Sequence, residues 1–152
     1  MNRATTWNAA LCSVLLLIAI SAPSGAQAER RIGIMTYAAE SRFVEAERGI
    51  RDQLRQDGLG EPAARLIRKS AEGSKARAAE LAREFASERL DLLLTIGTTA
   101  TITAVRQIKD VPIVFSIVYD PVEAGIAKGW KSSGNNTTGA SARIPMERLM
   151  EF

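Results

Sequence analysis

Gly97, Thr98 and Thr99 stand between two apolar stretches in the segment DLLLTIGTTATITAV, at 91–105. A glycine lets the backbone turn, and a threonine can cap a following helix, whose first N–H groups then lie at the positive end of the helix dipole. Such a helix end favours an anion. The segment has neither the G-x-x-x-x-G-K-[ST] nor the G-x-G-x-x-G pattern, so a small carboxylate is favoured over a polyphosphate. The alternative is that the threonines only cap the helix.

Tyr119, Asp120 and Pro121 form a second motif with two interpretations. Aspartate before proline is a common helix start, with Asp at the N-cap and Pro at the first helical position. In the functional alternative, the Asp120 carboxylate points into a cleft and pairs with an amine. Tyr37 and Tyr119 are the two tyrosines of the chain, and both are expected at strand ends, where they could stack on a ligand or simply pack at the rim.

The composition disfavours most catalytic and metal-dependent chemistry. The chain has no histidine and one cysteine, Cys12, which lies in an apolar N-terminal segment. The commonest general base and metal ligand are therefore absent, and no paired carboxylates stand out, because the glutamates of 45–47 and 80–88 are typical of solvated helix faces. We expect no enzyme, metal site or cofactor. The net charge of +3 comes from scattered basic residues, which gives no nucleic-acid footprint.

The first 28 residues are typical of a secretory signal peptide. Arg3 gives a positive start, residues 9–20 are almost wholly apolar, and Ala26-Gln27-Ala28 offers small residues for a signal peptidase. A membrane-spanning helix needs about 20 apolar residues, and this stretch stops well short. We predict cleavage after Ala28 and a periplasmic or secreted location.

The pattern of apolar and polar residues along the chain predicts the helices and strands that would position the two motifs. Strands are expected at 31–35, 64–67, 90–96 and 111–118, and helices at 43–57, 74–89, 98–108 and 122–127, with a polar turn at 135–139. This alternation indicates parallel βαβ units in a three-layer α/β/α sandwich, with the two most apolar strands in its centre. Loops 36–39, 97–100 and 119–121 would then share one sheet edge and form one cleft.

The chain resembles the ABC-transporter substrate-binding proteins with a type I periplasmic binding protein-like fold, the group of tryptophan- and tyrosine-type binders. The resemblance rests on IGIMTY at 32–37, FVEAERGIRDQL at 43–54, DLLLTIGTTATITAV at 91–105, VPIVFSIVYDPVEAGI at 111–126 and GNNTTGAS at 134–141. In place of the family's usual His-Pro pair after the first strand, this chain has Ala38-Ala39-Glu40.

The resemblance implies capture of a small, amino acid-like solute and its delivery to an ABC permease in the inner membrane. It assigns ligand binding to the following residues: Thr36, Tyr37, Thr98, Thr99, Ala100, Tyr119 and Asp120. In this assignment the start of the third helix meets a carboxylate, and the aspartate suits an α-amine.

The resemblance also implies a domain division. Residues 29–142 match the N-terminal lobe only, and 143–152 match the start of a crossover to a second lobe, so the chain is expected to be a truncated member. One lobe offers one wall of a cleft, and tight one-to-one amino acid binding by the 152-residue chain would contradict this expectation. The alternative function is a secreted sensory or interaction module of the same fold that does not serve transport; a secreted enzyme is the third.

Overall fold

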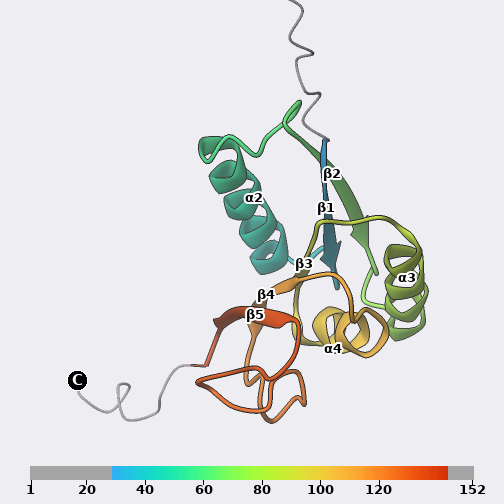
Figure 1. The fold of residues 1–152 in the computed structure, drawn as a ribbon. Helices are drawn as coiled ribbons and strands as arrows, with labels where there is room; N and C mark the ends of the chain where they lie inside the picture. Colours follow the sequence, from blue (N-terminus) through green and yellow to red (C-terminus); the bar gives the residue numbers. More distant parts are fainter. Residues whose placement is uncertain (1–28, 144–152) are drawn as a thin grey trace, which may run out of the picture.

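The computed structural model describes residues 29–143, which form a five-stranded sheet between two layers of helices (Figure 1). The elements follow in the order β1 (Arg30–Thr36), α2 (Ser41–Gln56), β2 (Ala64–Ser70), α3 (Lys75–Ser87), β3 (Leu92–Ile96), α4 (Thr98–Gln107), β4 (Ile113–Val118) and β5 (Thr137–Ser141). The predicted α/β/α sandwich is confirmed. The predicted signal peptide and most of the predicted crossover lie outside the described residues.

All neighbouring strands pair in parallel, in the order β2-β1-β3-β4-β5. The apolar β3 is the middle strand and β4 lies next to it, as their composition predicts. In a parallel sheet all carboxyl strand ends lie at one edge. The segments that follow β1, β3 and β4 therefore meet there.

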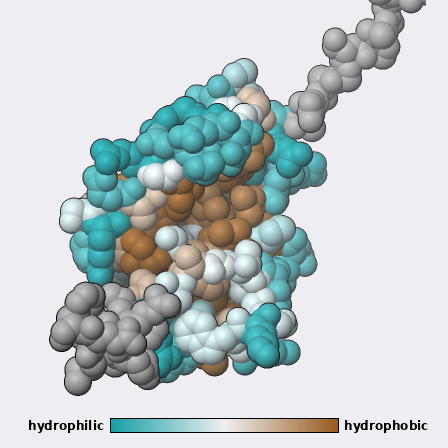
Figure 2. Space-filling model, turned by 90° about the vertical axis from the view of Figure 1, so that its left-hand side faces the viewer, coloured by the Kyte–Doolittle hydropathy of each residue, from teal (hydrophilic) through white to brown (hydrophobic). Residues whose placement is uncertain are grey.

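The helices cover the two faces of the sheet unequally. Figure 1 shows α2 on one side and α3 and α4 together on the other. The core on the α3–α4 side contains fully buried Leu81, Phe85 and Leu93, and the core on the α2 side contains Ile34 and Ile96. Because α2 is alone on its side, apolar surface remains exposed next to its polar outer face (Figure 2).

The helix ends follow the local signals in the sequence. Ser74 is the N-cap of α3, and its hydroxyl accepts a hydrogen bond of 3.2 Å from the backbone N–H of Arg77. Helix α2 ends before Gly58, which has a φ of +74°. That left-handed conformation suits glycine at a helix C-terminus.

Two sequence predictions are wrong. The helix predicted at 122–127 is absent: residues 121–125 form consecutive turns, and Gly125, with a φ of +69°, lies where the helix would have continued. The polar turn predicted at 135–139 is a turn only at Asn135 and Asn136, because β5 begins at Thr137. Gly139 lets β5 approach β4 closely, since a Cβ there would clash with the carbonyl oxygen of Phe115.

Candidate functional site

A cavity of about 370 Å³ lies where the loops after β1, β3 and β4 meet. Its lining comprises Tyr37, Glu40, Arg42, Phe43, Thr98, Thr99, Ile117, Tyr119 and Ala142. Three loops that are far apart in sequence thus contribute to one site, as the topology predicts.

Gly97 sets the geometry at the start of α4. It occupies the N-cap position with φ +100° and ψ 148°, and no side chain caps the helix. The expectation that Thr98 or Thr99 acts as the cap is therefore wrong. Because the first N–H groups of a helix have no partner within it, the uncapped start of α4 presents donors at the cavity.

Two buried threonine hydroxyls stabilise the turn at Gly97 from the core side. The hydroxyl of Thr101 donates to the carbonyl oxygen of Gly97 at 2.9 Å and lies 2.9 Å from the hydroxyl of Thr95. Thr95 and Thr101 are both fully buried. The turn is thus fixed by hydrogen bonds within the core, and Thr98 and Thr99 remain at the cavity wall.

Tyr37 is held at the cavity by its own hydrogen bonds. Its phenol donates to the carbonyl oxygen of Gly73 at 2.6 Å, and its backbone N–H donates to Ile96 at 3.1 Å. The ring is therefore oriented before any ligand arrives. Tyr119, which also lines the cavity, is in contrast 61% exposed and offers aromatic surface to solvent.

Asp120 binds its own backbone, as its capping interpretation predicts. One carboxylate oxygen accepts from the N–H groups of Val122 at 3.0 Å and Glu123 at 2.9 Å, and the other accepts from Arg143 at 2.9 Å. These donors lower the pKa of Asp120, the Glu123 N–H first among them. No helix follows the cap, because the chain turns instead.

The seven residues assigned by resemblance are thus only partly brought together. Tyr37, Thr98, Thr99 and Tyr119 line the cavity, whereas Thr36, Ala100 and Asp120 do not. Thr36 is 5% exposed and its hydroxyl donates to Glu47 at 3.2 Å, and Ala100 is fully buried behind the start of α4. The ligand-binding role of all seven stays a prediction.

Glu47 also departs from the solvated helix face that the sequence predicts. Its side chain is 14% exposed and pairs with Arg51 and Arg68 in addition to Thr36. Glu47 therefore connects α2 with the carboxyl end of β1 and with β2.

The cavity contains residues that the sequence did not indicate. Phe43 packs beneath Arg42, whose guanidinium lies 4.6 Å from the ring centre and pairs with Glu40 at 2.8 Å. Ile117 has a φ of +54°, an unusual conformation for a β-branched residue, at an irregularity in the β4–β5 register. Nothing in an apolar strand sequence signals such a backbone, although strained residues cluster at functional sites.

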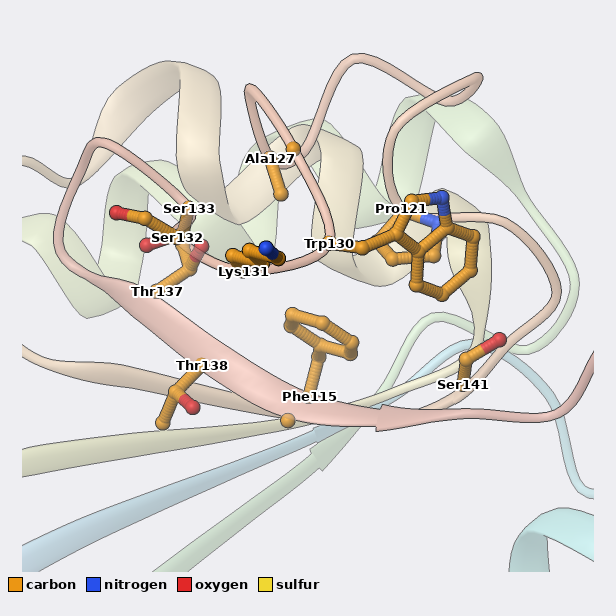
Figure 3. Close-up of a pocket in the computed structure, with 12 residues that line it drawn as sticks. Phe115, Pro121, Ala127, Trp130, Lys131, Ser132, Ser133, Thr137, Thr138 and Ser141 are labelled. Carbon is orange, nitrogen blue, oxygen red and sulfur yellow. The ribbon is translucent and has the colours of Figure 1, made fainter.

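A second cavity, of about 480 Å³, lies beside the edge strand β5. Figure 3 shows the loop with Pro121, Trp130 and Lys131 on one side of the cavity and β5 on the other, with the ring of Phe115 between β5 and the loop. It receives no residue from the loops after β1 or β3, so the cavity at the start of α4 is the better candidate. Within residues 29–143, no group of three or more His, Cys, Asp or Glu side chains could hold a metal ion. No described helix is long and apolar enough to cross a membrane.

Known proteins are similar to this chain in sequence and in fold. The family model for ABC transporter substrate binding proteins matches residues 31–152. A tyrosine-binding protein of Clostridioides difficile strain R20291 is 26% identical over 125 residues, which are 82% of this chain and 36% of the relative.

Two solved structures are similar in fold. A ligand-free, open substrate-binding protein with adhesive properties from Clostridium difficile has a TM-score of 0.78 and 26% identity, over 80% of this chain and 42% of that one. A Streptococcus pneumoniae ABC domain in complex with L-Trp has a TM-score of 0.76 and 24% identity, over 79% and 41%. The chain thus spans about two fifths of the length of these relatives.

Proposed function

This chain belongs to the family of ABC transporter substrate-binding proteins, and on that premise we propose that the cavity at the start of α4 binds a small, amino acid-like solute. The protein then passes the solute to an ABC permease in the inner membrane. Its location is periplasmic or secreted, after cleavage following Ala28, and it binds without catalysing a reaction. The relative named as tyrosine-binding supports an aromatic amino acid as the ligand class.

The uncapped start of α4 is the observation that carries this proposal. It presents backbone N–H groups without a side-chain cap, and Gly97 keeps side-chain atoms out of the turn. A carboxylate is the anion that an amino acid would bring to this position. Tyr37 and Tyr119 lie on the same cavity and provide aromatic surface for a ligand ring.

The remaining predicted residues would act from behind or beside the cavity. Thr36 and Ala100 support the ends of β1 and α4, and Asp120 would meet an α-amine only by exchanging its contact with Arg143. Residues 29–142 correspond in this proposal to one lobe, which provides one wall of a cleft. A single wall encloses little of a ligand, so we expect a dissociation constant on the order of 1 mM for the 152-residue chain.

NMR titration of the chain with L-tyrosine tests the proposal. We expect shifts at the amides of Thr98 and Thr99, and no such shifts with tyramine, which has the same ring and amine but lacks the carboxylate. Tyr119→Ala is expected to weaken binding. Trp130→Ala is the matched control, because Trp130 is similarly exposed, at 57% against 61%, and lies outside this cavity. Equal shifts with tyramine, or an equal effect of the two variants, would contradict the proposal.

A further inference from the structure

A groove of about 430 Å³ runs between α3 and α4, on the outer side of the helical layer. The two helices lie side by side on one face of the sheet (Figure 1). The groove is lined by Lys75 and Ala79 of α3 and by five residues of α4, which are Thr99, Ile102, Thr103, Arg106 and Gln107. It is separate from the cavity at the start of α4 except at Thr99, which lines both.

The charge of this groove is uniformly positive. Its charged lining residues are Lys75 and Arg106, and neither takes part in an ion pair within residues 29–143. Two cations near the groove are paired, since Arg77 of α3 pairs with Glu80 at 3.0 Å and Lys69 of β2 pairs with Glu84 at 3.0 Å. The groove thus presents two exposed cations and no carboxylate among the described residues.

Lys75 occupies a position that is electrostatically unfavourable for a cation. It is the first residue of α3, and the first turn of α3 contains no acidic residue. The N-terminal end of a helix carries partial positive charge, so a lysine there destabilises the helix slightly. An anionic group placed beside Lys75 would remove this cost.

Apolar atoms lie between the two cations. Ile102 is partly buried and packs against the core on the α3–α4 side, and Ala79 is half-buried on the facing helix. An apolar strip between two neighbouring helices, with a cation on each helix, is the complement of an amphipathic helix that carries acidic residues beside its apolar stripe.

We propose that this groove docks an acidic amphipathic helix of a partner protein. Apolar side chains of that helix contact Ile102 and Ala79, and its carboxylates pair with Lys75 and Arg106. Thr99 and Thr103 connect the docked helix to the first turn of α4, because the hydroxyl of Thr103 donates to the carbonyl oxygen of Thr99 at 2.7 Å. If the proposed function holds as well, ligand and partner therefore touch the same turn, and each changes the affinity for the other by the same factor.

Fluorescence anisotropy with a labelled peptide tests the docking. The probe is an acidic amphipathic peptide of Glu, Leu and Ala, about 14 residues or four helical turns long. We expect it to bind the 152-residue chain, and Lys75→Glu/Arg106→Glu to weaken binding by at least about tenfold. The same peptide with Lys in place of Glu is expected not to bind.

The matched control is Arg30→Glu/Arg65→Glu, which makes the same change in net charge. Both arginines are exposed and form no ion pair within the described part of the chain, and they lie at the amino ends of β1 and β2, at the opposite sheet edge. An equal loss in both double variants would show general attraction to a basic chain and overturn the proposal. Failure of the acidic peptide to bind, or equal binding of the basic one, would overturn it too. Lys75→Gln/Arg106→Gln repeats the test if charge reversal perturbs α3.

The same samples separate this inference from the proposed function. If the chain does not bind the peptide but still shows the L-tyrosine shifts, only the docking proposal is refuted. If the chain binds the peptide but shows no L-tyrosine shifts, the proposed function is refuted and the docking proposal stands.

Discussion

Replacing Gly97 with alanine should destabilise the protein through two effects that the structure separates. The φ of +100° and ψ of 148° at this residue lie in a region that is essentially restricted to glycine, which costs an L-residue about 1–3 kcal/mol. In addition, a Cβ would lie 3.3 Å from Phe43 Cε1 and 3.3 Å from Tyr37 Cβ, so both neighbours must give way. We expect a fall in unfolding free energy of about 2–3 kcal/mol, or in Tm of about 5–15 °C.

Urea titration of three alanine variants measures the two effects. Gly49 lies within α2 with nothing within 4 Å of its Cβ position, so Gly49→Ala is expected to stabilise the chain by about 0.5–1 kcal/mol. Gly58 has a φ of +74° but is equally uncrowded, so Gly58→Ala should cost only the backbone strain, about 1 kcal/mol. Gly97→Ala should be the most destabilising of the three. If it costs no more than Gly58→Ala, crowding at the turn contributes nothing and the reasoning fails.

Two further predictions concern hydrogen bonds near the site. Thr101→Val should cost about 1–3 kcal/mol of unfolding free energy, because it leaves the buried hydroxyl of Thr95 without its partner. In a urea-based double-mutant cycle, Thr95→Val/Thr101→Val should cost less than the sum of the single variants; strict additivity would show that the two hydroxyls are not coupled. The lowered pKa of Asp120 stabilises the fold above the carboxyl's unfolded value, near 4, and this contribution is lost as the pH falls through the lower folded pKa. Asp120→Asn keeps the cap and removes the charge, so its urea midpoint should fall less between neutral pH and about pH 3 than that of the original chain; parallel pH profiles would refute this role.

The sequence predicts the parts of the fold in which one side of an element is buried. Phe43, Ala46, Ile50 and Leu54 recur with helical spacing, and these residues face the core on the α2 side. Val44, which the same pattern places on this face, is instead 49% exposed. The apolar strands were predicted to within a few residues, and their parallel pairing follows from the alternation with helices. The meeting of Tyr37, Thr98 and Tyr119 at one cavity follows from this topology, because parallel strands bring their carboxyl ends to one edge.

The errors lie where burial is weak or where the backbone is unusual. Strand β5 is an edge strand whose residues after Thr137 are exposed, so it has no apolar alternation to reveal it. The turns at 121–125 begin like a helix at Asp120-Pro121, and the chain leaves the helical path at Gly125. The positive φ of Ile117 depends on the β4–β5 irregularity, a tertiary feature that local sequence does not encode.

Because helices cover the two faces of the sheet unequally, this molecule is amphiphilic. Two helices shield one side, while beside α2 the apolar surface of the other side meets water (Figure 2). A protein with apolar surface exposed on one side adsorbs at an air–water interface, because this removes the apolar surface from contact with water. In a thin vitrified film the particles would therefore lie in one dominant orientation, with the apolar surface beside α2, and not the charged outer face of α2 itself, towards the air.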